Sequence, residues 1–369
     1  MLAYIIRRLL LIIPTLFGIM VINFAIVQIA PGGPIEQLIA EISNIGTGTT
    51  GRISGSGGEI SGKNTAVSHN NITADNRYRG AQGLDPEFIK ELEVQFGFDK
   101  PLHIRFLNMM KNYFLFDFGT SFFRDEKVVD LVMSKLPVSI SLGLWTTLIV
   151  YLISIPLGIR KAVKDGTRFD IWTSTVLSVA YAIPSFVMAI VLIVLFAGGS
   201  FLDIFPLRGL TSENFTELSL LGQVIDYLWH LILPITALVA GSFLSLTMLT
   251  KNSYIDQINM LYVQTARAKG LTEGRVLYGH VFRNAMLIVI AGFPGAFISI
   301  LFTGAMLIEI IFSLDGLGLL GFEAALKRDY PIMFATVYFF TLLGLLLNLV
   351  GDLAYTVIDP RIDFDRRHA

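Results

Sequence analysis

Six long apolar stretches constrain the fold of this chain more than any other feature of its sequence. A helix needs about 20 mostly apolar residues to cross the hydrocarbon core of a bilayer. Six stretches meet that length, at residues 4–30, 137–159, 171–197, 229–250, 285–312 and 332–358. Because unpaired backbone groups are costly in lipid, each stretch is expected to be helical. The sequence therefore predicts an all-α integral membrane protein with six transmembrane helices.

The composition agrees with a chain that faces lipid over much of its surface. Hydrophobic residues make up 53% of the 369 residues and charged residues only 15%, whereas an ordinary soluble domain carries about 25% charge. The formal net charge of −1 gives no general reason to expect a nucleic-acid partner. The chain has no cysteine, which excludes disulfides, thiolate metal sites and a cysteine nucleophile.

Basic residues are distributed unequally between the two sides of the predicted spans. The N-terminus, the links after the second and fourth spans and the C-terminal tail hold 14 Lys and Arg residues, whereas the opposite short loops hold three. Short loops rich in Lys and Arg remain on the cytoplasmic side. We therefore predict that both termini are cytoplasmic and that a large insertion after the first helix, residues 31–136, is periplasmic.

This insertion has two parts of different composition. Between residues 43 and 83, 24 of 41 residues are Gly, Ser, Thr or Asn, which leaves too little apolar area to offset the entropy of ordering. We expect this part to be flexible and residues 84–136 to form short helices, because their apolar side chains recur at helical spacing. The predicted domains are a first helix (1–30), the insertion (31–136), a five-helix core (137–358) and a cytoplasmic tail (359–369).

Residue types that carry catalysis or bind metals are scattered. The five histidines, at positions 69, 103, 230, 280 and 368, include no pair at ligand spacing. Residues 57–64 nearly match a phosphate-binding loop, but Asn64 stands where Ser or Thr should be, and the motif lies in the Gly-rich insertion rather than between a strand and a helix. We therefore expect no catalytic, cofactor-binding or metal-binding residues, and no enzyme.

A few polar side chains lie within the predicted spans, where burial in hydrocarbon is expensive. Asn23 lies in the first span and Glu309 near the outer end of the fifth. Asn348 and Asp352, in the sixth, are four residues apart and share a helix face, which favours a clamp between helices. Each of these residues is a candidate either for interhelical bonding or for the lining of a pathway.

The inner link, residues 251–284, is the most specific stretch of the sequence. We interpret its first part as a helix with cations in its last turn and Gly270 as a left-handed terminator. Small side chains share one face, namely Thr265, Ala266 and Ala268. Thr272 can then cap a second helix, with Glu273 at its start. The predicted docking element comprises Thr265, Ala266, Arg267, Ala268, Lys269, Gly270 and Leu271.

This link resembles the EAA loop of ABC importer permeases, in which an Ala followed four residues later by a Gly marks the coupling helix. Ala266 and Gly270 match those positions, whereas Gln264 and Thr265 replace the usual Glu-Ala. The form of the link is similar to the peptide-importer branch, and other segments support it. These are residues 7–10 (RRLL), 30–34 (APGGP), 309–313 (EIIFS), 316–318 (GLG), 328–331 (RDYP) and 359–362 (DPRI).

The insertion and the loop at 205–210 look most like the Yej-type branch, which is also associated with microcin C uptake. The resemblance implies a type I ABC importer permease fold in a bacterial inner membrane. It also implies a second homologous permease, two ATPase subunits or one fused ATPase, and a periplasmic peptide-binding protein. ATP and Mg would be bound by the ATPase partners, while this chain would form half of the path for a peptide substrate.

Two other classes of protein were weighed against this interpretation. An ion-gradient-driven secondary transporter is the main alternative, and it should show midplane carboxylates or internal repeat symmetry. An intramembrane hydrolase would need a nucleophile facing a base within the spans. The sequence shows neither pattern convincingly.

Overall fold

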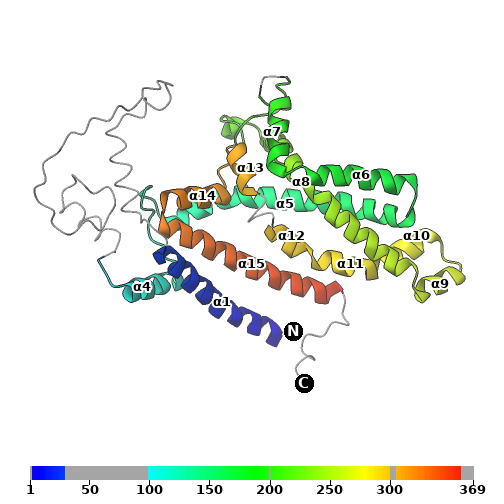
Figure 1. Ribbon diagram of the computed structural model, residues 1–369, viewed down its shortest axis with the longest axis horizontal. Coiled ribbons are helices and arrows are strands. Elements are labelled where there is room, and N and C mark those ends of the chain that lie inside the picture. The colour runs from blue at the N-terminus through cyan, green and yellow to red at the C-terminus, as the bar shows by residue number, and fades with distance from the viewer. Residues whose placement is uncertain (1, 30–98, 199–200, 300–304, 359–369) are drawn as a thin grey trace, which may run out of the picture. The chain divides into compact units, whose positions relative to one another are not determined.

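The structure is a computed structural model that describes residues 2–29, 99–198, 201–299 and 305–358 (Figure 1). The regular elements of these residues are all helical. They are α1 (Leu2–Ile29), α4 (Leu102–Phe114), α5 (Val128–Val163), α6 (Arg168–Ala182), α7 (Ser185–Phe196), η1 (Phe215–Glu217), α8 (Leu220–Ile258), α9 (Leu261–Ala268), α10 (Glu273–Arg275), η2 (Val276–Val281), α11 (Phe282–Ala291), α12 (Phe293–Ser299), α13 (Ala305–Ile311), α14 (Leu317–Lys327) and α15 (Tyr330–Ile358). The predicted flexible segment 43–83 and tail 359–369 lie outside the described residues.

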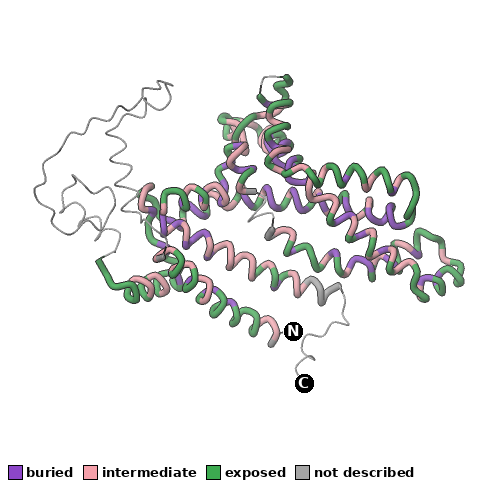
Figure 2. The backbone as a smooth tube through the Cα atoms, viewed as in Figure 1, coloured by how far each residue is buried: buried purple, intermediate pink, exposed green. Residues whose placement is uncertain are grey.

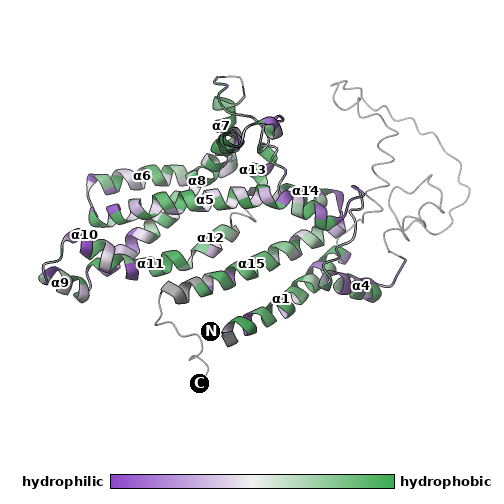
Figure 3. Cartoon of the chain, turned by 180° about the vertical axis from the view of Figure 1, so that it is seen from behind, coloured by the Kyte–Doolittle hydropathy of each residue, from purple (hydrophilic) through white to green (hydrophobic). Residues whose placement is uncertain are grey.

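Five helical segments are long and apolar enough to cross a membrane: 4–28, 128–163, 220–258, 273–297 and 330–353. A sixth crossing arises if α6 and α7 count as one broken span. Figure 3 shows that hydrophobic residues dominate the long helices, while hydrophilic residues gather at α9 and α10. The predicted all-helical membrane protein is therefore confirmed, with five to six candidate spans.

The third predicted span, 171–197, is not one helix. It consists of α6 and α7, which are bent by 91° relative to each other. The break lies at Ile183, which is extended at φ −88° and ψ 116°, and at Pro184, which precedes α7. A residue before proline avoids the α conformation, because the proline ring clashes with its backbone and Cβ. The predicted span is therefore divided into two helices at this point.

The fifth predicted span, 285–312, is also wrong in its boundaries. The candidate membrane helix here runs over residues 273–297, and it is interrupted where α11 ends at Gly292. The outer part of the predicted span contains α13, and residues 300–304, between α12 and α13, lie outside the described residues. Hydropathy located the apolar residues correctly, but it could not show that they are divided between different helices.

The chain forms two compact units. Unit 1 comprises Met1–Leu16, Leu131–Phe322 and Thr336–Ala369, and unit 2 comprises Phe17–Asp130 and Glu323–Ala335. In unit 1, α8 is the central helix, because α6, α7 and α11 all pack against it. Buried residues follow α5 and the middle of α8 (Figure 2). The core of unit 1 therefore forms around α8.

The packing of α5 against α8 is close enough to require a glycine. A Cβ added to Gly158 would lie 2.6 Å from Cβ of Thr250 and 2.8 Å from the carbonyl oxygen of Thr247. Nearby, Ser154 Oγ donates a hydrogen bond of 3.4 Å to the carbonyl oxygen of Phe243. Small residues commonly allow membrane helices to approach in this way.

Unit 2 contains α4 and the stretch that follows it. Asp329 anchors this stretch, since its carboxylate accepts hydrogen bonds from Ser121 Oγ (2.5 Å) and from the backbone N–H of Phe122 (3.3 Å). An ion pair of 2.5 Å between Arg124 and Glu323 lies in the same unit. The α4 helix lies within residues 84–136, for which short helices are predicted, but residues 128–136 belong to the long helix α5 and residues 84–98 lie outside the described part of the chain.

Candidate functional site

The predicted docking element, Thr265 to Leu271, consists of α9 and the turn that ends it. Gly270 has φ +80°, in the left-handed region, as predicted. The N–H of Gly270 donates to the carbonyl oxygen of Arg267 (2.9 Å), and the N–H of Leu271 donates to that of Ala266 (3.4 Å). This pair of bonds is the Schellman pattern of a helix C-terminus. The backbone of the turn is thus closed by its own hydrogen bonds.

The side chains of α9 divide into two sets. Val263 and Ala266 are buried in the core of unit 1, at 0% and 6% exposure. Thr265 and Ala268 are exposed. The prediction that Ala266 shares an exposed small-residue face is therefore wrong. Residues 263 and 266 are three apart and lie on the same side of the helix, where the small side chain allows α9 to approach its own chain.

The start of α10 also differs in detail from the prediction. Thr272 occupies the N-cap position, with φ −63° and ψ 148°, but its side chain makes no capping hydrogen bond. Glu273 instead pairs with Arg267, which donates from Nε at 2.9 Å and from an Nη at 3.3 Å. This pair joins the two sides of the Gly270 turn. Lys269, in the same turn, is exposed and is not part of this pair.

A π-helix, η2, connects α10 to α11. Its buried residues Val276 and Val281 are both at 0% exposure, whereas His280 is exposed on the same short element. Such wide turns are rare and occur frequently at functional sites. Beyond it, Ser253 Oγ donates a 2.6 Å hydrogen bond to the carbonyl oxygen of Ala285, which ties α8 to α11. The docking element is therefore attached to the core at both ends.

A buried charge cluster, which the sequence analysis missed, connects α5, α6 and α8. Lys161 is completely buried, and its Nζ lies 2.9 Å from Oδ1 of Asp170. It also donates to Thr173 Oγ1 (2.7 Å) and to Ser174 Oγ (2.8 Å). The other oxygen of Asp170 receives a 2.7 Å bond from Lys251. A buried charge is tolerated only when it is paired and hydrogen-bonded, and Lys161 satisfies both conditions.

In the sequence, Lys161 is one of the basic residues of the link after the second predicted span. Nothing in the sequence distinguished it from Arg160 and Lys164, because Lys251 lies 81 residues beyond Asp170. The only available signal was a lysine next to a membrane span with an aspartate in the following short link. That pattern is too common to single out one residue.

Glu309 connects three helices of unit 1. It is completely buried, and its carboxylate accepts hydrogen bonds from Ser139 Oγ and from the N–H of Leu319, both at 2.8 Å. A Cβ on Gly318 would lie 2.9 Å from one of its oxygens. Both oxygens are therefore engaged within unit 1, joining α13 to α5 and α14. Of the two roles considered for Glu309, this arrangement favours the interhelical one.

The other polar candidates do not form one site. Asp352 accepts a 2.8 Å hydrogen bond from the Tyr4 hydroxyl and forms a 2.9 Å ion pair with Arg8. Asn348 is exposed, so the predicted clamp contains Asp352 alone and joins α15 to α1. Asn23 is half-buried in unit 2. A four-residue spacing placed Asn348 and Asp352 on similar faces, but only Asp352 reaches the neighbouring helix.

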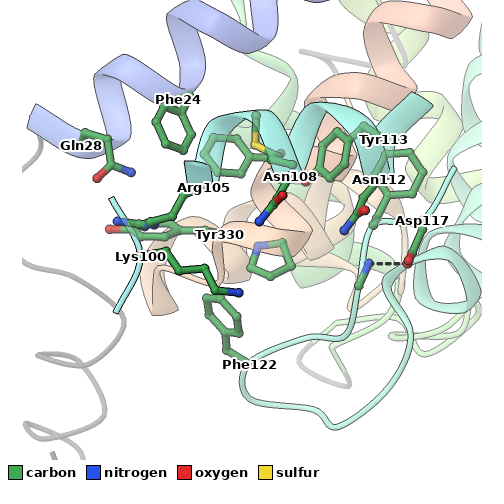
Figure 4. A pocket seen from close by; sticks show the side chains of 15 residues that line it. Phe24, Gln28, Lys100, Arg105, Asn108, Asn112, Tyr113, Asp117, Phe122 and Tyr330 are labelled. Carbon is green, nitrogen blue, oxygen red and sulfur yellow. Dashed lines mark hydrogen bonds between the residues drawn. The ribbon is translucent and has the colours of Figure 1, made fainter. Parts of the chain in front are cut away.

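Unit 2 holds a cavity of about 280 Å³ that the sequence did not indicate (Figure 4). Cationic, amide and aromatic side chains line it, among them Phe24, Gln28, Lys100, Arg105, Asn108, Asn112, Phe122, Tyr330 and Phe334. Tyr113 also borders it, and burial raises the pKa of the Tyr113 phenol. None of the predicted site residues lines this cavity.

Comparison with known proteins identifies the family. The model of the binding-protein-dependent transport system inner membrane component matches residues 154–364. The chain is 60% identical to the peptidoglycan transport system permease protein YejB of Agrobacterium fabrum, with 99% of each chain covered. It is 58% identical to the inner membrane ABC transporter permease protein YejB of Escherichia coli O157:H7, over 99% of this chain and 100% of the relative.

A more distant relative is the oligopeptide transport system permease protein AppB of Bacillus subtilis, which is 32% identical over 99% of this chain and 100% of its own length. These matches confirm the resemblance to permeases of ABC peptide importers and to their Yej-type branch. The chain belongs to the family of binding-protein-dependent transport system inner membrane components.

Proposed function

We propose that this chain is one of two permease subunits in an ATP-driven importer of peptides. The relatives that support this substrate class are named for oligopeptide and for peptidoglycan transport. Peptides and the peptide-bearing fragments of cell walls share an amide backbone, so we take short peptides, including microcin C-like peptides, as the substrate class. A periplasmic peptide-binding protein would deliver them, and a second homologous permease would form the other half of the path.

The observation that carries the proposal is the geometry of α9 and its terminal turn. The exposed residues of this element, such as Thr265 and Ala268, are presented by a backbone that is anchored through Val263 and Ala266. A rigid element attached to the end of α8, a helix of 39 residues, can transmit a displacement into the core. We assign it the role of the coupling helix that contacts the ATPase.

ATP and Mg would then bind to the ATPase partners, whether these are two chains or one fused chain. Nucleotide-driven closure of the ATPase would move α9, and α10 would follow because Gly270 and the Arg267–Glu273 pair fix the turn between the two helices. The comparisons give no support to the ion-gradient-driven alternative. We propose that both termini lie on the cytoplasmic side, with the ATPase, and the distribution of basic residues supports this.

The test is co-purification from native membranes in mild detergent, followed by mass spectrometry, together with peptide uptake by cells. The wild-type chain should recover a second permease and an ATPase. Gly270→Val should insert normally but lose both the ATPase and uptake, because a β-branched residue is strained at φ +80°. Gly209→Val is the matched control, since Gly209 has φ +83° in a loop outside the docking element and its variant should retain the ATPase.

Two results would overturn the proposal. One is a wild-type chain that purifies repeatedly without any ATPase. The other is a Gly270→Val variant that inserts, loses nothing and transports peptide at the wild-type rate. Equal loss of the ATPase in both glycine variants would show that backbone strain alone dissolves the complex, and would remove the special role given to the α9 turn.

A further inference from the structure

The helix α4 exposes large apolar side chains that the described part of the chain does not cover. Leu107 is 62% exposed and Phe114 is 73% exposed. They lie on the same side of the helix, because seven residues make about two turns. Leu115 and Phe116 follow directly and are exposed as well. Apolar side chains gathered in this way mark a surface that contacts a membrane or another protein.

The remaining surface of α4 has two different sides. One side packs within unit 2 through Phe106 and through Tyr113, which is buried. The other side is polar and carries Arg105, Asn108 and Asn112, which line the cavity of unit 2 (Figure 4). Successive helical residues are about 100° apart, so this polar side lies about 140° around the helix axis from the apolar side. The exposed surface of α4 is therefore amphipathic.

Phe106 fixes the position of α4 along α1. Its ring centre lies 6.1 Å from that of Phe17 and 5.3 Å from that of Phe24. Both partners belong to the candidate membrane segment 4–28. With a rise of about 1.5 Å per residue, Phe24 and Phe17 lie about 6 Å and about 17 Å before the end of that segment at Gln28. The helix α4 therefore lies beside the apolar segment, near one of its ends, rather than beyond it.

The end of α4 places an aromatic residue where glycine is usual. The N–H of Asp117 donates to the carbonyl oxygen of Asn112 (2.9 Å), and the N–H of Phe116 donates to that of Tyr113 (3.1 Å). In this Schellman pair Phe116 occupies the left-handed position, with φ +56°. Such a backbone is strained for a bulky residue. Packing within the chain leaves 52% of Phe116 exposed, so a contact outside the chain explains why a large apolar residue stands here.

We propose that α4 is an interfacial helix, which lies along the bilayer surface beside the end of α1 that leads into the insertion. Lipid covers its apolar side, where Leu107, Phe114 and Phe116 enter the boundary between headgroups and acyl chains to a depth of about 5–10 Å. The polar side, with Arg105, is turned to the phosphate groups and to water. A protein partner would account for the exposed apolar residues alone. A boundary between lipid and water also accounts for the polar side and for the contact with a candidate membrane segment. The inference requires only that α1 crosses the membrane, and it is independent of the substrate proposed above.

The absence of cysteine makes a direct test possible, because a single nitroxide label can be attached at a chosen position. Leu107→Cys and Phe114→Cys place the label on the apolar side of α4, and Asn108→Cys and Asn112→Cys are the matched controls on its exposed polar side. Ile22→Cys, on α1 at a residue that is 60% exposed, gives the value for lipid. The chain, with the subunits that co-purify with it, is placed in liposomes of phosphatidylethanolamine and phosphatidylglycerol. Paramagnetic resonance then measures how often each label collides with oxygen, which concentrates in lipid, and with nickel(II) ethylenediaminediacetate, which stays in water.

Labels at Leu107→Cys and Phe114→Cys should collide more often with oxygen than with the nickel complex, at a depth of about 5–10 Å below the phosphate groups. Labels at Asn108→Cys and Asn112→Cys should show the opposite preference. A nickel preference at all four positions would show that the apolar side lies in water, and would overturn the inference. Rare collisions with both reagents at the apolar positions would overturn it too, because another protein subunit would then cover them. Adding the periplasmic binding protein should change none of these values, and a loss of oxygen collisions on its addition would identify a protein docking surface instead.

A second variant pair tests the end of the helix. Phe116→Gly keeps the turn, because glycine readily adopts a positive φ, but it removes the ring that contacts lipid. Combined with Phe114→Cys, it should lower the ratio of oxygen to nickel collisions at that label. The control is Asp125→Gly, since Asp125 also has a positive φ (+52°) and is exposed in unit 2, and this variant should leave the ratio unchanged. An unchanged ratio with Phe116→Gly, or an equal change with Asp125→Gly, would contradict the role of Phe116.

Discussion

Gly158 and Gly270 illustrate two different uses of glycine in this molecule. Gly158 has an ordinary helical backbone, but any side chain would collide with Thr250 on the facing helix. Gly270 has open space around a notional Cβ, and the constraint is its positive φ of +80°. The first residue is required by tertiary packing and the second by the local backbone. Substitutions at the two positions should therefore fail in different ways.

We expect Gly158→Ala to destabilise the protein by about 1–3 kcal/mol, the usual cost of overpacking. The added methyl group would force α5 away from α8. A thermal unfolding measurement in detergent checks this, with Gly18→Ala as the control, because a Cβ at Gly18 meets nothing within 4 Å and alanine favours helix. Equal melting temperatures for the wild type and Gly158→Ala would show that the two helices are less tightly packed than the structure indicates.

The buried cation Lys161 gives a second prediction at the residue scale. Lys161→Met leaves Asp170 buried with one partner fewer, and breaking such a pair costs about 3–5 kcal/mol. The control is Lys164→Met, since the Lys164 ammonium lies on the surface 5.7 Å from the Phe169 ring centre, a contact worth about 0.5–1 kcal/mol. Denaturant unfolding of both variants measures the difference. Comparable losses would mean that Lys161 is accessible to water in solution.

At the scale of elements, α9 combines anchoring and presentation in eight residues. Val263 and Ala266 face the core, while Thr265 and Ala268 face outward. Because an α-helix turns once every 3.6 residues, residues that are adjacent in the sequence of α9 lie on different faces. The small residues of this segment form one motif in the sequence but have two roles in the structure. Ala266 packs in the core, whereas Thr265 and Ala268 lie on the surface.

This division predicts opposite phenotypes for two similar substitutions. Ala266→Leu should lower the melting temperature, since it adds volume at a position with 6% exposure. Ala268→Leu should leave the melting temperature unchanged but reduce recovery of the ATPase, because it alters only the exposed face. Thermal unfolding and co-purification are measured on both variants. A stable Ala266→Leu protein, or full ATPase recovery with Ala268→Leu, would contradict the corresponding half of the prediction.

At the scale of the whole molecule, the α6–α7 pair decides how many times the chain crosses the membrane. A bend of 91° is compatible with a broken span or with a re-entrant segment. The charge distribution favours a crossing, because residues 160–168 are rich in Lys and Arg and the loop after α7 is not. The positions of Lys164 and Glu213, on either side of the pair, distinguish the two arrangements.

We expect single thiols at Lys164→Cys and Lys269→Cys to react with a membrane-impermeant maleimide in inside-out vesicles only, in membranes from cells without the ATPase, because Lys269 belongs to the docking element. A thiol at Glu213→Cys should react in intact spheroplasts only. All three positions are exposed, and the chain has no cysteine of its own to interfere. Labelling of Lys164→Cys and Glu213→Cys from the same side would show that α6 and α7 re-enter, and the molecule would then have five crossings.

The features that the sequence determined by itself are those with local causes. Apolar stretches identified the membrane helices, because transfer to lipid is summed over neighbouring residues, and Gly270 was recognised as a left-handed terminator from its place after Arg267 and Lys269. The family resemblance depended on short motifs of the same kind. The proposed coupling role of residues 265–271 remains a prediction that the experiments above test.

Only the tertiary structure decided which side chains meet. It brought Lys251 to Asp170 across 81 residues, Ser139 to Glu309 across 170, and Tyr4 to Asp352 across 348. It turned Ala266 inward and broke the third span at Pro184. These outcomes depend on how separate helices pack. Hydropathy and helical period specify which faces can be buried, but not the partner that buries each of them.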